Sequence, residues 1–293
     1  YAITQVSSML FNRQWTEPVG ELATSWDISP DGTTYTFHLR KGVMWHDGNE
    51  VFPEGQSREV TAHDVVYSID RYANLETSSW PADIANIYES VEAIDDYTVV
   101  LKLSARDAII YEKARGLTTT AIVAKEAIEH FGDTYGQNVI GSGPFELVSF
   151  SPDDEIVLKR NEDFYTDVCL DGVIFKALPD APAALIALEA GDIDYWGSVT
   201  PGDNVEGIIT NPNQTLNDFG CPVATRTVFS LQSAQYNDVR FRKAFTFMRD
   251  GNAVNAALRG DTHVEQPAGL SGLGGTAGHG VKGYLEGLYD EFF

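Results

Sequence analysis

The residues that could do chemistry form no recognised catalytic motif. The 293 residues contain no Gly-x-Ser-x-Gly elbow, no Gly-x-x-x-x-Gly-Lys-Ser/Thr phosphate loop and no His-Glu-x-x-His zinc motif. Gly272-x-Gly274 follows no expected strand, so it does not indicate a dinucleotide site. We therefore predict that the protein is not an enzyme, with no catalytic residues and no cofactor.

Metal chemistry finds equally little support. Residues 27–32 read Asp-x-Ser-x-Asp-Gly, as in the first half of a calcium loop, but the twelfth position is His38 where such a loop needs an acid. His38, His46 and His63 fall on an expected strand, a turn and a helix start, so surface or turn roles are expected for them. The sequence predicts no metal site.

One unit of expected secondary structure organises the chain. Tyr35, Phe37 and Leu39 alternate with polar residues, which predicts a half-buried strand over residues 34–39. A second short apolar run, ending at Trp45, closes at an Asp-Gly turn. Thr61 can cap a helix whose third residue is Asp64. The unit is predicted to be strand, strand, helix.

Further elements are expected along the rest of the chain. Alternating runs predict hairpins over residues 90–103 and 146–158. Helical patterns occupy residues 124–131, closed by Gly132, and residues 239–258. A strand at 173–178, a helix at 182–190 and a strand at 192–196 predict a parallel crossover, the unit of a doubly wound sheet.

The composition is that of a folded, acidic protein. Hydrophobic residues make up 43%, and 43 acidic against 20 basic residues give a formal charge of −23. This charge repels phosphate backbones, so nucleic-acid binding is not expected. The sequence contains no run of about 20 apolar residues, the length needed to span a bilayer.

Three blocks of residues carry a resemblance to a known family. The first runs through the strand, strand, helix unit: Leu22-Ala23-x-Ser25-Trp26, Ser29-x-Asp31-Gly32-x-x-Tyr35-x-Phe37-x-Leu39-Arg40-x-Gly42-Val43-x-Trp45-x-Asp47-Gly48 and Thr61-Ala62-x-Asp64-Val65-Val66-Tyr67-Ser68. The second is Gly141-Ser142-Gly143-Pro144-Phe145 followed by Leu158-x-Arg160-Asn161-x-x-Phe164-Tyr165. The third is Asn237-Asp238-Val239-Arg240-x-Arg242-x-Ala244. Together they closely resemble the family 5 extracellular solute-binding proteins, the peptide, dipeptide and nickel-binding receptors of ABC importers.

The resemblance implies an α/β fold of the two-lobe periplasmic-binding-protein type (type II). By this resemblance, residues 1–12 and 141–220 would form the core of lobe I, and residues 13–140 an additional α+β subdomain of that lobe. Residues 221–293 would form the hinge and the start of lobe II. Because family members continue well past this point, the second lobe is expected to be incomplete in this chain.

The resemblance also implies where a ligand would bind. In a two-lobe receptor the ligand lies between the lobes, which close around it. Backbone groups near the start of the chain could pair with an extended peptide. The substrate-binding residues expected on the first-lobe wall are Thr4, Gln5, Val6, Trp80, Trp196, Gly197, Ser198 and Phe219.

The expected function is that of a receptor that captures oligopeptides or dipeptides and passes them to the membrane permease of an ABC importer. Such a receptor is expected to be a monomer located outside the cytoplasm, in the periplasm or lipid-anchored at the outer face of the cell membrane. Nickel chelates and oligosaccharides are alternative ligands, because the matched blocks belong to the scaffold. A second interpretation is a one-lobed interaction or sensor module without transport.

The two cysteines leave an alternative open. Cys169 and Cys221 could form one disulfide, or each could be a free thiol.

Overall fold

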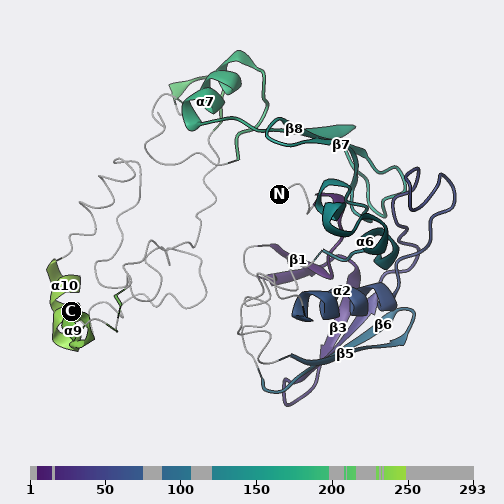
Figure 1. Cartoon of the computed structure of the whole chain (residues 1–293), viewed down its shortest axis with the longest axis horizontal. Helices are drawn as coiled ribbons and strands as arrows, with labels where there is room; N and C mark the ends of the chain where they lie inside the picture. Colours follow the sequence, from purple (N-terminus) through teal and green to yellow (C-terminus); the bar gives the residue numbers. More distant parts are fainter. Residues whose placement is uncertain are drawn as a thin grey trace. The chain divides into compact units, whose positions relative to one another are not determined.

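The computed structural model describes residues 5–14, 17–74, 88–106, 121–197, 208, 210–215, 229–230, 232 and 234–248 (Figure 1). The chain divides into two compact units, Tyr1–Ala177 and Leu178–Phe293. The lobe boundaries expected from the sequence, at residues 1–12 with 141–220, 13–140 and 221–293, stay a prediction.

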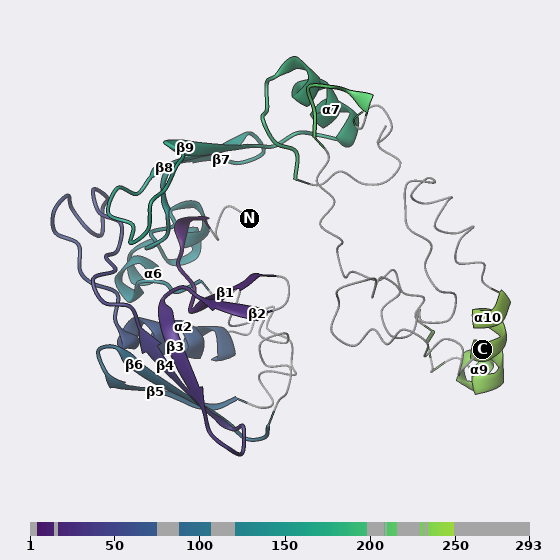
Figure 2. The same ribbon diagram turned by 180° about the vertical axis from the view of Figure 1, so that it is seen from behind.

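A four-stranded antiparallel sheet is the main element of the first unit (Figures 1 and 2). Its order is β3 (Ala23–Ile28), β4 (Thr34–Leu39), β6 (Thr98–Leu103) and β5 (Tyr88–Asp95). The alternation predicted for β4 is confirmed, because Tyr35, Phe37 and Leu39 are buried. The hairpin predicted over residues 90–103 is also confirmed as β5 and β6.

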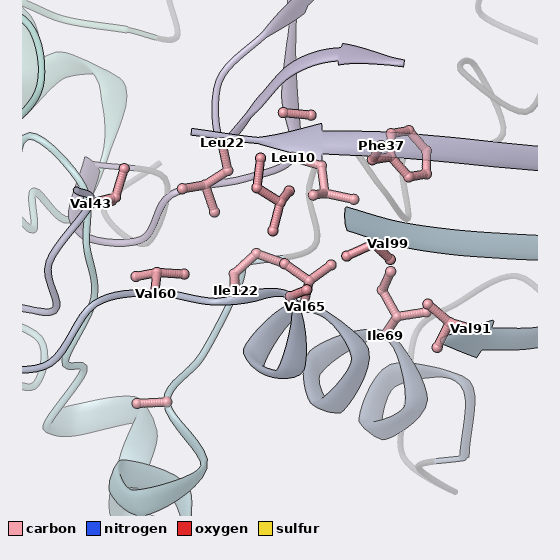
Figure 3. Close-up of a cluster of buried hydrophobic side chains, with 14 of the residues drawn as sticks. Leu10, Leu22, Phe37, Val43, Val60, Val65, Ile69, Val91, Val99 and Ile122 are labelled. Atoms are coloured by element: carbon pink, nitrogen blue, oxygen red, sulfur yellow. The ribbon is translucent and has the colours of Figure 1, made fainter. Parts of the chain in front are cut away.

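Helix α2 (Ala62–Asn74) covers one face of this sheet. It begins where predicted, because the Thr61 N–H donates to Asp64 Oδ2 at 2.9 Å, which is one half of a capping box. Figure 3 shows Val65 and Ile69 pointing from the helix toward Val99 and Val91 of the sheet. Leu10 lies in the same core.

The second strand expected in this unit does not form. Around residues 43–45 the structure has only an isolated bridge between Met44 and Glu59. The Val60 N–H donates to Val43 O and the Trp45 N–H donates to Arg58 O, but the pairing extends no further, and side chains hold the intervening loop. Asn49 Oδ1 accepts from the backbone N–H groups of Val51 and Phe52, and Ser57 Oγ donates to Trp45 O.

Two smaller sheets complete the first unit. Strands β1 (Phe11–Gln14) and β2 (Glu17–Gly20) pair antiparallel. The second hairpin predicted from sequence is confirmed as β7 (Phe145–Ser151) and β8 (Glu155–Arg160), with β9 (Gly172–Lys176) added antiparallel beside β8. Helix α6 (Lys125–Phe131) ends at Gly132, as predicted, and a 3₁₀ helix follows over Gly132–Gln137.

The second unit contains three described helices: α7 (Ala181–Ala190), α9 (Ala234–Asn237) and α10 (Val239–Met248). Helix α7 is capped by the Asp180 side chain, which accepts from Ala183 N–H at 2.8 Å, and it ends at Gly191 with φ 78°. The helix predicted over residues 239–258 is confirmed up to Met248, and its remainder lies outside the described residues.

The parallel crossover expected around α7 is wrong for the described residues. Residues 192–196 form no strand, and every strand pair in the described part of the chain is antiparallel. After Gly191 the N–H groups of Asp192 and Ile193 donate back to Ala187 O, at 2.8 and 3.4 Å. These groups complete the C-terminus of the helix, so they are not available to a ladder.

A single arginine ties the loop at residues 49–60 to two helices. The guanidinium of Arg58 makes two hydrogen bonds to Asp64 in α2, at 2.7 and 2.8 Å, and two to Glu126 in α6, at 2.7 and 2.8 Å. The Asp64 side chain is only 5% exposed. Hydrogen bonding to Asp64 raises the pKa of Arg58, and hydrogen bonding from Arg58 lowers the pKa of Glu126. The interaction is charge-assisted and bidentate on both sides.

A partly buried carboxyl group, that of Glu21, lies beside Met9 just before β3. Glu21 Oε1 accepts from the Met9 N–H at 3.1 Å. The nearby Arg40 donates to the backbone oxygen of Glu21, not to its carboxylate, and lies over the ring of Tyr165 at 4.2 Å. Burial raises the pKa of Glu21 from 4.5 to about 7, although the Met9 hydrogen bond works in the opposite direction.

We expect Arg58→Met to lower the free energy of unfolding by about 3 kcal/mol, because it leaves the buried Asp64 carboxylate without its cation. Arg160→Met is the matched control, because Arg160 also pairs with two carboxylates, Glu162 and Asp171, whose side chains are 75% and 97% exposed. The control should lose less than about 1 kcal/mol. Urea unfolding measures both, and equal losses would contradict the assignment.

We expect Glu21→Gln to stabilise the protein increasingly as the pH rises from about 4.5 to above 7. The unfolded carboxyl group ionises first, so the folded state loses stability until the pH passes the folded pKa of about 7. At pH 8 the gain should be on the order of 2 kcal/mol. Urea unfolding between pH 5 and 8 measures it, with the exposed Glu129→Gln as control. A difference from wild type that does not change with pH would refute this expectation.

Candidate functional site

The N-terminal segment, residues 5–8, is fixed against the Gly-Ser-Gly run at residues 141–143. The Gly143 N–H donates to Val6 O at 2.8 Å, and Ser8 Oγ donates to Ser142 O at 2.7 Å. The Val6 side chain is 3% exposed and packs in a small core with Val139, Phe145 and Leu158. Both the carbonyl group and the side chain of Val6 are therefore engaged within the protein.

This arrangement restricts how the predicted contact residues could act. Gln5 and Val6 lie in a helical turn rather than in an extended strand. Because Val6 O already accepts from Gly143, a ligand could not use it in an undisturbed strand pairing. Gln5 is partly exposed. Both residues stay predicted contacts, and Thr4 lies outside the described residues.

Positions 141 and 143 must be glycine because the backbone there lies close to the backbone of Gln5 and Val6. A Cβ atom at position 141 would lie 1.9 Å from Val6 O. One at position 143 would lie 2.7 Å from Val6 O and 2.8 Å from Gln5 O. Since the atoms in the way are backbone atoms, no side-chain rotation can relieve these clashes.

Two side chains converge on the carbonyl group of Gly143. His46 Nε2 and Asn161 Nδ2 each lie 3.0 Å from Gly143 O. His46 also donates its backbone N–H to Gly141 O at 2.8 Å. Burial lowers the pKa of His46, which favours the neutral ring with Nε2–H as the donor. Residues 141–143 are thereby fixed from two further segments.

The sequence did not single out His46 for this role. We expected a surface or turn position for all three histidines near the start of the chain, but His46 is 6% exposed. His38 lies 3.1 Å from Asp27, and His63 lies 3.8 Å from Asp96; both are exposed. The three do not come together, and within the described ranges no group of three or more His, Cys, Asp or Glu could hold a metal.

The other described contact residues follow helix α7, in the second unit. Trp196 is half-buried, and Tyr195 is 73% exposed. A Cβ atom on Gly197 would lie 3.1 Å from a ring carbon of Tyr195, so the ring lies against the backbone of Gly197. Trp80, Ser198 and Phe219 lie outside the described residues. Trp196 and Gly197 stay predicted contacts.

The structure describes one of the two cysteines. Cys169 is an exposed free thiol. Cys221 lies outside the described residues, so its state stays a prediction.

The chain belongs to a defined protein family. The model of the bacterial extracellular solute-binding proteins, family 5, matches residues 17–283. This confirms the family predicted from the sequence. Members of this family bind solutes and are not enzymes, and they act outside the cytoplasm. No helix in the described part of the chain is long and apolar enough to cross a membrane.

Individual relatives cover nearly all of this chain but only part of their own length. The dipeptide-binding protein of Escherichia coli (strain K12) is 29% identical over 275 residues, which are 87% of this chain and 49% of that protein. Heme-binding protein A of Haemophilus influenzae is 29% identical over 266 residues, 85% of this chain and 48% of that protein. The chain thus spans about half the length of these curated relatives.

A solved structure supports the fold class. An ABC transporter-associated periplasmic binding protein from Helicobacter pylori, in complex with the peptide STSA, superimposes with a TM-score of 0.76. It is 25% identical, and the match covers 90% of this chain and 55% of that one. The α/β, type II periplasmic-binding-protein fold predicted from the sequence is therefore confirmed for the part that this chain spans.

We expect Gly141→Ala to lower the free energy of unfolding by more than about 3 kcal/mol, because its Cβ would meet the Val6 carbonyl group. Gly136→Ala is the matched control: a Cβ there has nothing within 4 Å, and its change should stay within about 0.5 kcal/mol. Thermal and urea unfolding compare the two. Equal stability of both variants would show that the backbones at residues 6 and 141 are not in close contact.

Proposed function

We propose that this chain is part of the substrate-binding receptor of an ABC importer that captures oligopeptides or dipeptides. The observation that carries the proposal is the family match over residues 17–283, together with relatives that bind peptides by name or in their solved complex. The receptor works without chemistry: it holds its ligand between two lobes, and closure removes water from the ligand. Its partner is the membrane permease, and it acts as a monomer in the periplasm or anchored at the outer face of the membrane.

In the first unit, the segment that carries predicted contact residues is held rigidly by the rest of the protein. Residues 5–8 carry predicted contacts, and hydrogen bonds from Gly143, Ser8 and Ile122 fix this segment to the rest of the unit. A binding group that is fixed before the ligand arrives loses little conformational entropy on binding. In the second unit, the exposed ring of Tyr195 lies against Gly197 and could contact a ligand there.

The test is a binding comparison on the full-length, natively exported protein. Isothermal titration with di-, tri- and tetrapeptides should give saturable 1:1 binding, whereas heme, nickel–histidine and oligosaccharides should bind at least tenfold more weakly. Heme belongs in the panel because one relative at 29% identity is a heme-binding protein. Saturable binding of heme or nickel–histidine without peptide binding would replace the proposed ligand. Binding of none of these ligands would favour the interaction or sensor module.

A substitution at Gly197 tests whether the ligand binds at this predicted contact. Gly197→Ala should weaken peptide binding roughly tenfold, because the added methyl group presses on the Tyr195 ring and displaces it beside the predicted contact. Gly136→Ala, remote from the predicted contacts in sequence and open around its Cβ position, should bind as wild type does. Equal affinities of both variants would remove Gly197 from the site and leave the ligand class untouched.

A further inference from the structure

One motif in the second unit plays no part in the proposed binding function. Asn213-Gln214-Thr215 has the form Asn-x-Ser/Thr with a residue other than proline in the middle, and the 293 residues contain no second triplet of this form. In exported proteins such a triplet is the acceptor for N-linked glycans, which are attached to the asparagine amide. Because the triplet also occurs by chance, its surroundings in the structure decide whether it is a usable acceptor.

The triplet lies at the end of a β-turn. The Gln214 N–H donates to Asn211 O at 3.1 Å, which closes the turn with Pro212 at its second position. The side chain of Asn211 supports the same turn, because its Oδ1 accepts from the Asn213 N–H at 3.0 Å. Asn211 therefore holds the turn, and the side-chain amide of Asn213 is not needed for it.

The backbone conformation at position 213 does not require asparagine. Turns favour asparagine chiefly where φ is positive, a region that most side chains avoid. Among the described residues other than glycine, only Asp153 has a positive φ, so Asn213 does not occupy that region. Most residue types could therefore form this turn, and its geometry gives no reason for an amide at position 213.

The two residues that define the motif lie at the surface. Asn213 and Thr215 are exposed, whereas both polar side-chain atoms of Gln214 between them are buried. Gln214 thus anchors the middle of the triplet and leaves the asparagine and the threonine accessible. A glycan is bulky and must be attached at the surface. Members of the family act outside the cytoplasm, where exported proteins meet the enzymes that transfer glycans.

We propose that Asn213 is the attachment site of an N-linked glycan. The donor is an oligosaccharide carried on a lipid phosphate. A C–N bond forms between Asn213 Nδ2 and the anomeric carbon of the sugar, while the bond from that carbon to the phosphate oxygen of the carrier breaks. The lipid phosphate leaves with the bonding electron pair, and the amide loses one proton to a base of the transferase. The modification is independent of which solute the receptor binds.

The intact mass of the full-length protein, purified from the cells that export it naturally, tests the proposal. Asn213→Gln is the reference, because it keeps an amide, removes the acceptor and has the same chain ends as wild type. Wild type should be heavier than this variant by the mass of whole sugar residues, and peptide mapping should assign the sugar to the peptide that contains Asn213. Thr215→Ala should remove all of the excess mass, whereas Thr215→Ser, which keeps the hydroxyl group, should retain it.

Three results would overturn the proposal. The first is a wild-type protein without excess mass. The second is an excess that persists in Asn213→Gln, which would place the modification on another residue. The third is an excess that Asn213→Gln removes and Thr215→Ala keeps, since the modification would then not depend on the triplet. The two Thr215 variants differ at an exposed position, so a difference between them reports recognition by the transferase and not a failure to fold.

Discussion

The contact between the backbone of residues 5–8 and that of residues 141–143 is the constraint on which the first unit depends. It exists only because positions 141 and 143 carry no Cβ atom, and the peptide groups brought together there satisfy each other. His46 and Asn161 then converge on Gly143 O from two further segments. The run of residues 141–143 therefore fixes three other parts of the chain relative to one another: residues 5–8, His46 and Asn161.

Arg58 plays a comparable part for the loop at residues 49–60. In a chain with 43 acidic and 20 basic residues, two carboxylates from different helices share one guanidinium group. The arginine comes from a loop without regular structure, so its ion pairs do for residues 49–60 what a ladder would do for a strand. The cost of burying Asp64 is offset only while all these bonds are made together. The loop at residues 49–60 therefore contributes to the stability of the fold through Arg58.

Much of the fold could be predicted from local patterns, because those patterns report forces that act within a few residues. The alternation of Tyr35, Phe37 and Leu39 gave the strand β4, and the Thr61–Asp64 spacing gave the start of α2. Gly132 and Gly191 marked the ends of their helices correctly. The prediction failed where a second local pattern competed for the same backbone groups. Residues 192–196 read as a strand, yet their first N–H groups complete helix α7.

The candidate site is less predictable than the scaffold, because scaffold residues satisfy groups within the protein and ligand-facing residues do not. Each block that carries the family resemblance satisfies backbone groups: Asp64 accepts from Thr61, Asn161 donates to Gly143, and Asp238 accepts from Arg240 at the start of α10. Such residues keep the fold whatever solute a member of the family binds. Specificity depends instead on side chains that face the ligand and need satisfy nothing within the protein, so they leave no comparable pattern in a single sequence. His46 illustrates the intermediate case, since its part in fixing Gly143 becomes evident only when segments 97 residues apart are brought together.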